Sequence, residues 1–259
     1  MTCNGDVVKQ ISEIDNEQHA YLVGNLAYQD ESEALDFEAR ARIIGDSGSG
    51  MEKGLIKRIG VVDHGVGNSI AILNLLRKIG IEAVKIKDAT EFDGLSPSDS
   101  KIVIPGVGSF DAGMNALRVS RLDMAISKFA AAGGGILGIC LGMQLLFERS
   151  DEGSSDGLGL IPGDLIAIKS NPQFRVPHVG WESVIPVKED LIFSGITRLT
   201  FYHNHSYGLP SPSPFEIARI QYSDQFVVAA RNENVVGVQF HPEKSHSSGE
   251  QLMKNFINL

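Results

Sequence analysis

The sequence predicts an α/β protein with a mostly parallel sheet flanked by helices and with antiparallel strands added in its C-terminal half. From residue 57 onward, short apolar and β-branched runs alternate with segments of helical periodicity. That alternation is typical of parallel sheets covered on both faces. After residue 158 the runs become shorter and follow one another without helices between them, which is typical of antiparallel strands.

The expected elements follow in order along the chain. In the first part we expect strands at 59–63, 83–86, 101–104 and 135–139, and helices at 68–79, 122–132 and 141–148. Gly80 ends the first of these helices, and Asp111 is expected to cap a further one after Pro105-Gly106. In the second part we expect strands at 160–168, 182–186, 200–205, 215–221, 226–231 and 235–240, and a last helix at 249–258.

Acidic residues are concentrated in the first segment of the chain. The 259 residues carry a net charge of −9, and residues 1–55 hold eleven acidic and four basic side chains of this total. Residues 45–50 consist of glycine, serine and one aspartate, a composition typical of flexible linkers. We therefore expect residues 1–55 to be a flexible acidic extension, with the working domain starting near Met51 and occupying residues 56–259. Neither part has the basic surface of a nucleic-acid-binding protein.

Composition also limits the cellular setting. No apolar run approaches the roughly 20 residues of a transmembrane helix, and the first residues lack the pattern of a secretory signal. The two cysteines, Cys3 and Cys140, are too few for a disulfide framework. These features predict a cytoplasmic protein.

Cys140 lies between a buried strand and a helix, with Gly138 and Gly142 on either side. A tight strand-to-helix turn presents a nucleophile at the carboxyl edge of a sheet, and small flanking residues relieve the crowding there. The backbone N–H groups that follow favour a thiolate and a developing oxyanion. The alternative is a buried cysteine that acts as a small hydrophobic residue.

A cysteine nucleophile needs a base and a group that orients the base. His241-Pro242-Glu243 follows a strand and supplies both. His203 and His205 lie two apart on another strand, a spacing that also suggests metal binding, but the sequence offers no third ligand at suitable spacing. We therefore expect no metal.

Two glycine-rich turns follow strands. Gly65-Val66-Gly67 resembles part of a dinucleotide-binding fingerprint, but Ile70 occupies the position of its third glycine. Pro105-Gly106-Val107-Gly108-Ser109 places backbone donors where an oxyanion hole is needed.

Together these motifs resemble the class I (triad-type) glutamine amidotransferases, whose fold is flavodoxin-like, and within them most closely the glutaminase subunits of imidazole glycerol phosphate synthase. The resemblance runs from about Ile59 to Leu259. It is carried by segments 62–68, 104–110, 138–147, 157–163, 176–181, 205–207 and 239–245. The cysteine turn and His-Pro-Glu are shared by the whole class, whereas segments 104–110 and 176–181 and Lys244-Ser245 are more specific to this branch.

The resemblance implies a role for each matching residue. Cys140 matches the nucleophile, His241 the base and acid, and Glu243 the orienting carboxylate. The oxyanion hole is implied at the backbone of Val107, Gly108 and Leu141. Glutamine binding is implied at Gly108, Gln144, Glu152, Ser206 and Tyr207, and the partner interface at Gly67, Asn68 and Lys244.

The resemblance also implies a partner and no cofactor. Ammonia released from glutamine would pass to a (β/α)8-barrel cyclase in a heterodimer. The cyclase would make imidazole glycerol phosphate, for histidine synthesis, and aminoimidazole carboxamide ribonucleotide.

The sequence departs from the family pattern near the implied partner face. His64 replaces a common tyrosine, Glu182 replaces an asparagine, and His203-Asn204 replaces apolar residues. These departures leave the partner open, and supply of ammonia to a surface-sugar (lipopolysaccharide-type) amidotransferase is an alternative. A catalytically silent subunit of the same fold and a cysteine hydrolase with another substrate are two further alternatives. The intact triad argues against the silent subunit, and Gly108 and Gln144 argue against the other substrate.

Overall fold

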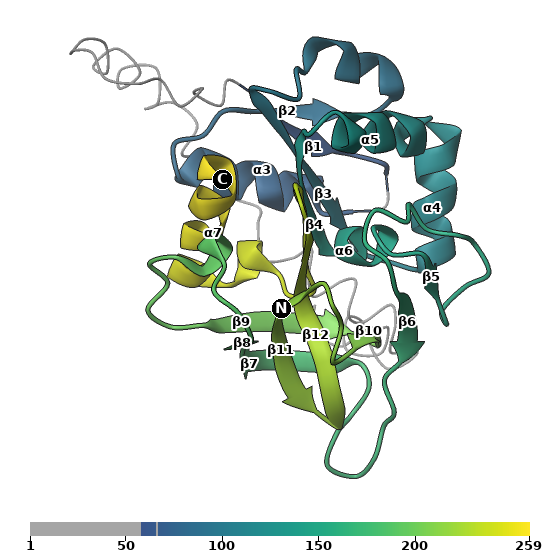
Figure 1. Ribbon diagram of the computed structural model, residues 1–259, viewed down its shortest axis with the longest axis vertical. Helices are drawn as coiled ribbons and strands as arrows, with labels where there is room; N and C mark the ends of the chain where they lie inside the picture. Colours follow the sequence, from purple (N-terminus) through teal and green to yellow (C-terminus); the bar gives the residue numbers. More distant parts are fainter. Residues whose placement is uncertain (1–57, 66) are drawn as a thin grey trace, which may run out of the picture. The chain divides into compact units, whose positions relative to one another are not determined.

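A computed structural model describes residues 58–65 and 67–259, and the fold in Figure 1 has a central sheet with helices on both sides. The predicted α/β fold, with parallel strands followed by antiparallel ones, is confirmed. The acidic extension predicted for residues 1–55 lies outside the described residues.

The parallel part of the sheet has the strand order β2-β1-β3-β4-β13. Its strands are β1 (Arg58–Val62), β2 (Ala83–Ile86), β3 (Ser100–Gly106), β4 (Gly135–Cys140) and β13 (Val235–Val238). β3 and β4 are buried on both faces, which is why their sequences are almost continuously apolar.

The sheet continues on the far side of β13 through strands that pair antiparallel, except that β5 pairs parallel with β6. These additional strands are β5 (Arg149–Ser150), β6 (Asp164–Ala167), β8 (Ile185–Pro186), β10 (Tyr207–Pro210), β11 (Glu216–Tyr222) and β12 (Asp224–Asn232). β7 (His178–Ser183) and β9 (Thr200–His205) form a separate antiparallel pair.

Helices cover the two faces of the parallel sheet (Figure 1). The helices are α3 (Ser69–Lys78), α4 (Phe110–Val119), α5 (Leu122–Ala131), α6 (Leu141–Leu145) and α7 (His246–Asn258), and the short 3₁₀ segments are η2 (Ala89–Gly94), η3 (Leu191–Phe193) and η4 (Pro242–Lys244). Apolar residues of α3 and α7 share one core with Val103 and Leu137 of the sheet, whereas those of α4, α5 and α6 share a second core with Ile102 and Ile104. Successive side chains of one strand thus enter opposite cores.

Several predicted boundaries were wrong. α6 ends at Leu145, although the apolar run predicted a helix to residue 148. Asp111 does not cap α4: the N-cap position belongs to Ser109, and the Asp111 carboxylate accepts hydrogen bonds from the backbone N–H groups of Ser154 and Ser155. β7 begins at His178, four residues before the expected strand, and β5 and β10 were not predicted.

None of the helices within the described ranges combines the length and apolar character needed to cross a bilayer.

Lys101 of β3 carries a buried ammonium that ties the sheet to the last helix. It is 6% exposed, and its Nζ donates a hydrogen bond of 2.7 Å to the carbonyl of Phe256 near the end of α7. Burial, followed by the charge of Arg231, lowers the pKa of Lys101 from 10.5 to about 8. The unfolded chain therefore binds more protons than the folded chain between these two values.

We therefore expect the free energy of unfolding to gain a contribution from Lys101 as pH rises from about 8 to 10.5. In Lys101→Met this part of the rise should disappear. Lys254→Met, at an exposed position of α7, the helix that Lys101 contacts, should keep it. Denaturant titrations across this pH range measure the difference. Parallel pH profiles for wild type and Lys101→Met would contradict the assignment.

Candidate active site

The carboxyl ends of three neighbouring parallel strands meet at one edge of the sheet. Gly106, at the end of β3, pairs in register with Cys140, and Val238, at the end of β13, pairs with Ile139 of β4. The segments that follow these strands therefore lie side by side, in the region where open α/β sheets bind ligands. They carry the residues predicted as oxyanion hole, nucleophile and base: Val107 and Gly108, Cys140 and Leu141, and His241.

Cys140 occupies a constrained turn between β4 and α6. Its backbone φ is +54° and ψ is −112°, a conformation that residues other than glycine rarely adopt. A Cβ atom at Gly142 would collide with the carbonyl oxygen of Ile104 in β3, and one at Gly138 would lie 2.5 Å from the carbonyl oxygen of Gly142. The chain thus makes the turn because both flanking positions lack side chains. α6 has only five residues, so it has no long helix dipole. We therefore expect a negative charge at Cys140 to be stabilised by individual backbone N–H groups.

His241 and Glu243 form a buried hydrogen-bonded pair. The distance from Nδ1 of His241 to Oε1 of Glu243 is 2.8 Å, and the two side chains are 2% and 5% exposed. The backbone of His241 is held by Tyr202, whose carbonyl accepts its N–H, and by Ser245, whose hydroxyl donates to its carbonyl. A carboxylate that accepts the Nδ1 proton orients the imidazole and leaves Nε2 to face a nucleophile.

His241 and Glu243 each stabilise the charged form of the other. Burial alone would lower the pKa of His241, but the charges of Cys140 and Glu243, with hydrogen bonding, outweigh it and raise this pKa to about 10. Burial would raise the pKa of Glu243, but the charge of His241 and their hydrogen bond hold it below its usual value. Nε2 of His241 makes no other hydrogen bond among the described residues, so its proton is available to a bound molecule.

Two unpredicted residues contact the sulfur of Cys140. The thiol lies 3.8 Å from the backbone oxygen of Asn204, and Nε2 of Gln239 lies 3.9 Å from Sγ. Gln239 also accepts a hydrogen bond of 3.2 Å from Nε2 of Gln144. Its position in the segment Gln-Phe-His-Pro-Glu, two residues before His241, was the signal available in the sequence.

Exposed backbone next to Cys140 lies in the predicted oxyanion region. Gly108 has a φ of +111°, which favours glycine, and it follows partly exposed Val107. A Cβ at Gly106 would lie 2.9 Å from Cβ of Leu141. The loop after β3 and the turn after β4 are therefore in close contact.

The predicted glutamine-binding residues surround the same edge of the sheet. Gln144 is 5% exposed, and its Nε2 donates to the carbonyl of Tyr207 at 3.4 Å. Glu152 accepts a hydrogen bond of 2.7 Å from the backbone N–H of Phe110, two residues after Gly108. Ser206 is partly exposed, and its carbonyl accepts from Ile168.

Comparison with known proteins agrees with this geometry. Residues 60–259 match the family described as glutamine amidotransferase class-I. The chain belongs to the class I glutamine amidotransferases. Membership makes it an enzyme of that family.

Two curated relatives carry a more specific name. The chain is 42% identical over 202 residues to imidazole glycerol phosphate synthase subunit HisH 2 of Pseudomonas aeruginosa, a match that covers 77% of this chain and 98% of that protein. It is 39% identical to the protein of the same name from Methanococcus maripaludis, with the same shares covered.

Solved structures show the same fold. A protein described as "Structure of PurLQS from Thermotoga maritima" superimposes with a TM-score of 0.60 at 21% identity, covering 78% of this chain and 97% of that one. A crystal structure described as a glutamine amidotransferase gives 0.59 at 19% identity, covering 77% and 97%.

The residues predicted to contact a partner lie at the edge of the sheet that carries Cys140. Gly67 is exposed, Asn68 caps α3 by accepting from the N–H of Ala71, and Nζ of Lys244 lies 5.3 Å from the centroid of the Tyr202 ring. His64, in the turn before Gly67, donates through Nε2 to the carbonyl of Pro105 at 3.1 Å. The expected partner-facing turn is thus bonded to β3, the strand that leads into the predicted oxyanion loop.

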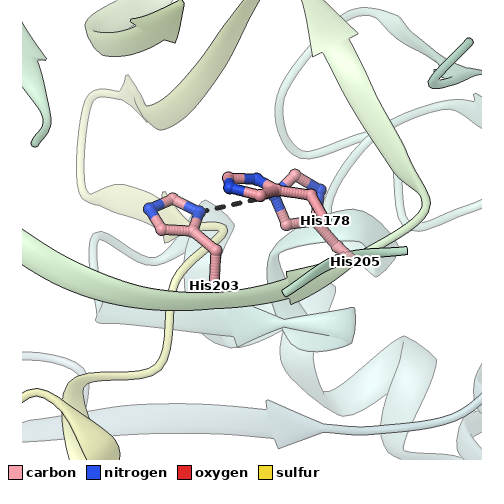
Figure 2. A group of neighbouring side chains, drawn as sticks. All are labelled: His178, His203 and His205. Atoms are coloured by element: carbon pink, nitrogen blue, oxygen red, sulfur yellow. Dashed lines mark hydrogen bonds between the residues drawn. The ribbon is translucent and has the colours of Figure 1, made fainter. Parts of the chain in front are cut away.

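Figure 2 shows a third histidine beside the two that the sequence singled out. His178, at the start of β7, pairs in register with His205 of β9, and His203 lies on the same face of β9. Sequence spacing offered no third ligand, because residues 178 and 205 meet only through the pairing of two strands.

A nuclear magnetic resonance titration of the histidine side chains tests the electrostatics of the triad. Because Cys140 is the largest of the influences that raise the pKa of His241, we expect Cys140→Ala to lower this pKa from about 10 by about 1 to 3 pH units. His64, whose lowered pKa comes from burial and not from Cys140, serves as the internal reference. An unchanged pKa of His241 in Cys140→Ala would show that Cys140 does not stabilise the protonated form of His241.

Proposed function

We propose that this chain is the glutaminase subunit of an imidazole glycerol phosphate synthase. It hydrolyses glutamine to glutamate and ammonia and passes the ammonia to a cyclase subunit in histidine biosynthesis. The arrangement of Cys140, His241 and Glu243 at the carboxyl edge of the sheet is the observation that carries the glutaminase part. The names of the two curated relatives support the pathway part.

In the proposed first step, the Cys140 thiolate attacks the side-chain amide carbon of glutamine. The carbon–sulfur bond forms as the carbonyl π electrons move to oxygen, which gives a tetrahedral oxyanion. The backbone N–H groups of Leu141 and of Val107-Gly108 are proposed to stabilise this charge. A raised pKa supports His241 as the proton donor, because its imidazolium persists at neutral pH.

Collapse of the intermediate breaks the carbon–nitrogen bond. His241 gives its Nε2 proton to the departing nitrogen, ammonia leaves, and an acyl-thioester remains on Cys140. His241, now neutral and oriented by Glu243, takes a proton from water, which attacks the thioester. The second tetrahedral intermediate expels the Cys140 thiolate, and glutamate is released. No cofactor takes part in this sequence of steps.

The glutamine substrate is proposed to lie along Gly108, Gln144, Glu152, Ser206 and Tyr207. Gln144 is held by Gln239 and by the carbonyl of Tyr207, so its amide has a defined orientation. Glu152 is bonded to Phe110 and so stands next to the loop that carries Gly108. A carboxylate at this place suits the α-ammonium group of glutamine.

The proposed partner is a (β/α)8-barrel cyclase that forms a heterodimer with this chain. Free ammonia becomes protonated in water and loses its nucleophilicity, so a glutaminase of this kind needs an acceptor site that is sheltered from solvent. Gly67, Asn68 and Lys244 lie at the same sheet edge as Cys140, which supports docking of the barrel over this edge.

The proposal is tested by reconstituting synthesis with the full chain, a histidine-pathway cyclase barrel and its nucleotide substrate. With glutamine as nitrogen source, we expect Cys140→Ala to reduce glutamate release and imidazole glycerol phosphate formation by at least about 10⁴-fold. With an ammonium salt as nitrogen source, wild type and Cys140→Ala should support equal synthesis.

Two results would contradict the proposal in different ways. Equal glutamine-dependent rates in wild type and Cys140→Ala would exclude Cys140 as the nucleophile. Labelling of Cys140 by a reactive glutamine analogue, without glutamate release beside the cyclase, would exclude the histidine-pathway partner and favour a sugar amidotransferase as acceptor.

A further inference from the structure

Three buried histidines form a compact cluster next to the proposed catalytic residues. His178, His203 and His205 are 2%, 0% and 5% exposed. One ring nitrogen from each lies within 4.8 Å of the others, and Figure 2 shows the three rings turned toward one another. The proposed glutaminase reaction uses none of these side chains.

Hydrogen bonding defines the protons of His205. Its Nδ1 lies 2.9 Å from the carbonyl oxygen of Tyr207, and a carbonyl can only accept, so Nδ1 carries the proton. The lone pair of His205 Nε2 therefore points into the cluster, toward Nδ1 of His203.

Other nitrogens of the cluster are buried without hydrogen bonds. Nε2 of His203 and both ring nitrogens of His178 have no hydrogen-bond partner among the described residues. Buried polar atoms are normally satisfied, and those that are not require an explanation. A shared ligand that accepts lone pairs, such as a metal ion, is one such explanation.

The spacing of the rings fits a metal of tetrahedral geometry. Two nitrogens bound to one zinc ion at about 2.0–2.1 Å lie about 3.3 Å apart. Nδ1 of His203 and Nε2 of His205 are 3.3 Å apart. His203 binds through Nδ1 after the proton on Nδ1 moves to Nε2. The ligand nitrogen of His178 lies at most 4.8 Å from those of the other two residues, so it reaches a spacing of about 3.3 Å by moving at most about 1.5 Å.

Neighbouring groups match those that orient metal-bound histidines. Imidazole ligands usually donate their second N–H to a carbonyl or a carboxylate. The Tyr207 carbonyl has this relation to His205, and Oε1 of Glu182 lies 3.7 Å from Nε2 of His178. The ring of Tyr222 stacks on His178 with a centroid distance of 3.9 Å and limits its rotation.

We propose that His178, His203 and His205 form a binding site for a divalent transition-metal ion of the kind that imidazole favours, with zinc as the best-fitting probe. Three protein ligands leave the fourth tetrahedral position for water or another small ligand.

Metal binding at this site would act on the glutaminase, a consequence that rests on the proposed function. Asn204, between the two histidines of β9, places its carbonyl oxygen 3.8 Å from Sγ of Cys140. The charge of His241 acts on both His203 and His205, so a dication held by these two residues would in turn disfavour the imidazolium form of His241, which the proposed reaction needs to protonate ammonia. We therefore expect zinc to inhibit glutamine hydrolysis.

Binding is measured directly with Zn²⁺ and the metal-free full chain carrying Cys140→Ala, which removes the thiolate as a competing ligand. Isothermal titration calorimetry should show one strong site for each chain. Adding His203→Phe, which keeps an aromatic ring at this buried position, should weaken affinity by more than about 100-fold, because outer-shell changes alone cost up to that factor. Adding His246→Phe, at an exposed histidine of α7, should leave affinity unchanged.

X-ray absorption spectroscopy of the zinc-loaded Cys140→Ala chain needs no change to the cluster and decides the matter if His203→Phe does not fold. Three imidazole nitrogens at about 2.0–2.1 Å support the site. A sulfur ligand, or oxygen ligands in place of imidazole, would overturn the proposal. So would the absence of zinc uptake, or equal affinities of folded His203→Phe and His246→Phe.

Zinc inhibition is then compared in chains that keep Cys140. Wild type should lose glutaminase activity with zinc occupancy, and His203→Phe should resist at the same concentration. If zinc binds but metal-free wild type with its cyclase releases no glutamate, the proposed function fails while the metal site stands.

Discussion

The close backbone packing between the turn at Cys140 and strand β3 is the constraint on which the site depends. Gly142 comes so near to the carbonyl of Ile104 that no side chain fits, and Gly138 faces the carbonyl of Gly142 in the same way. Without this approach, Cys140 would not take up its left-handed backbone conformation at the end of β4. The positions of the loop after β3, where the oxyanion hole is predicted, and of His241 follow from it, because β3 and β13 are the two neighbours of β4.

Buried charge is concentrated at the same edge of the sheet. His241 keeps a proton in a nearly solvent-free position because Cys140 and Glu243 compensate the cost of burial. The histidines of β9 behave in the opposite way: burial without a carboxylate partner lowers the pKa of His205 to about 3. One protonated and several neutral imidazoles therefore lie close together, the first suited to proton transfer and the others to binding a cation through lone pairs.

Local sequence patterns predicted much of the fold, because strands and amphipathic helices are recorded in consecutive residues. Strands 83–86 and 200–205 and the helix after Asn68 lie where periodicity placed them. The apolar run after Cys140 led to a predicted helix that is longer than α6. Leu146 and Phe147 are buried against the second core, but they lie in a turn after the helix has ended. Periodicity does not distinguish these two ways of burying a side chain.

The cysteine turn and His-Pro-Glu could be predicted from the sequence because each is a short motif that follows a strand. Gln239, Asn204 and His178 were not, since their roles come from strand register and from residues far away in the chain. In particular, His178 meets His205 across 27 positions of sequence, which no ligand-spacing rule anticipates.

The most direct test of the central claim is the rate at which a reactive glutamine analogue labels Cys140, followed by mass spectrometry of the intact full chain. Wild type is compared with Gly142→Ala and with Gly94→Ala, where the added methyl group meets only the flexible end of Arg58. We predict rapid labelling of wild type and Gly94→Ala, and slow labelling with a loss of about 1–3 kcal/mol in stability for Gly142→Ala. A stable Gly142→Ala chain that labels as fast as wild type would contradict the account.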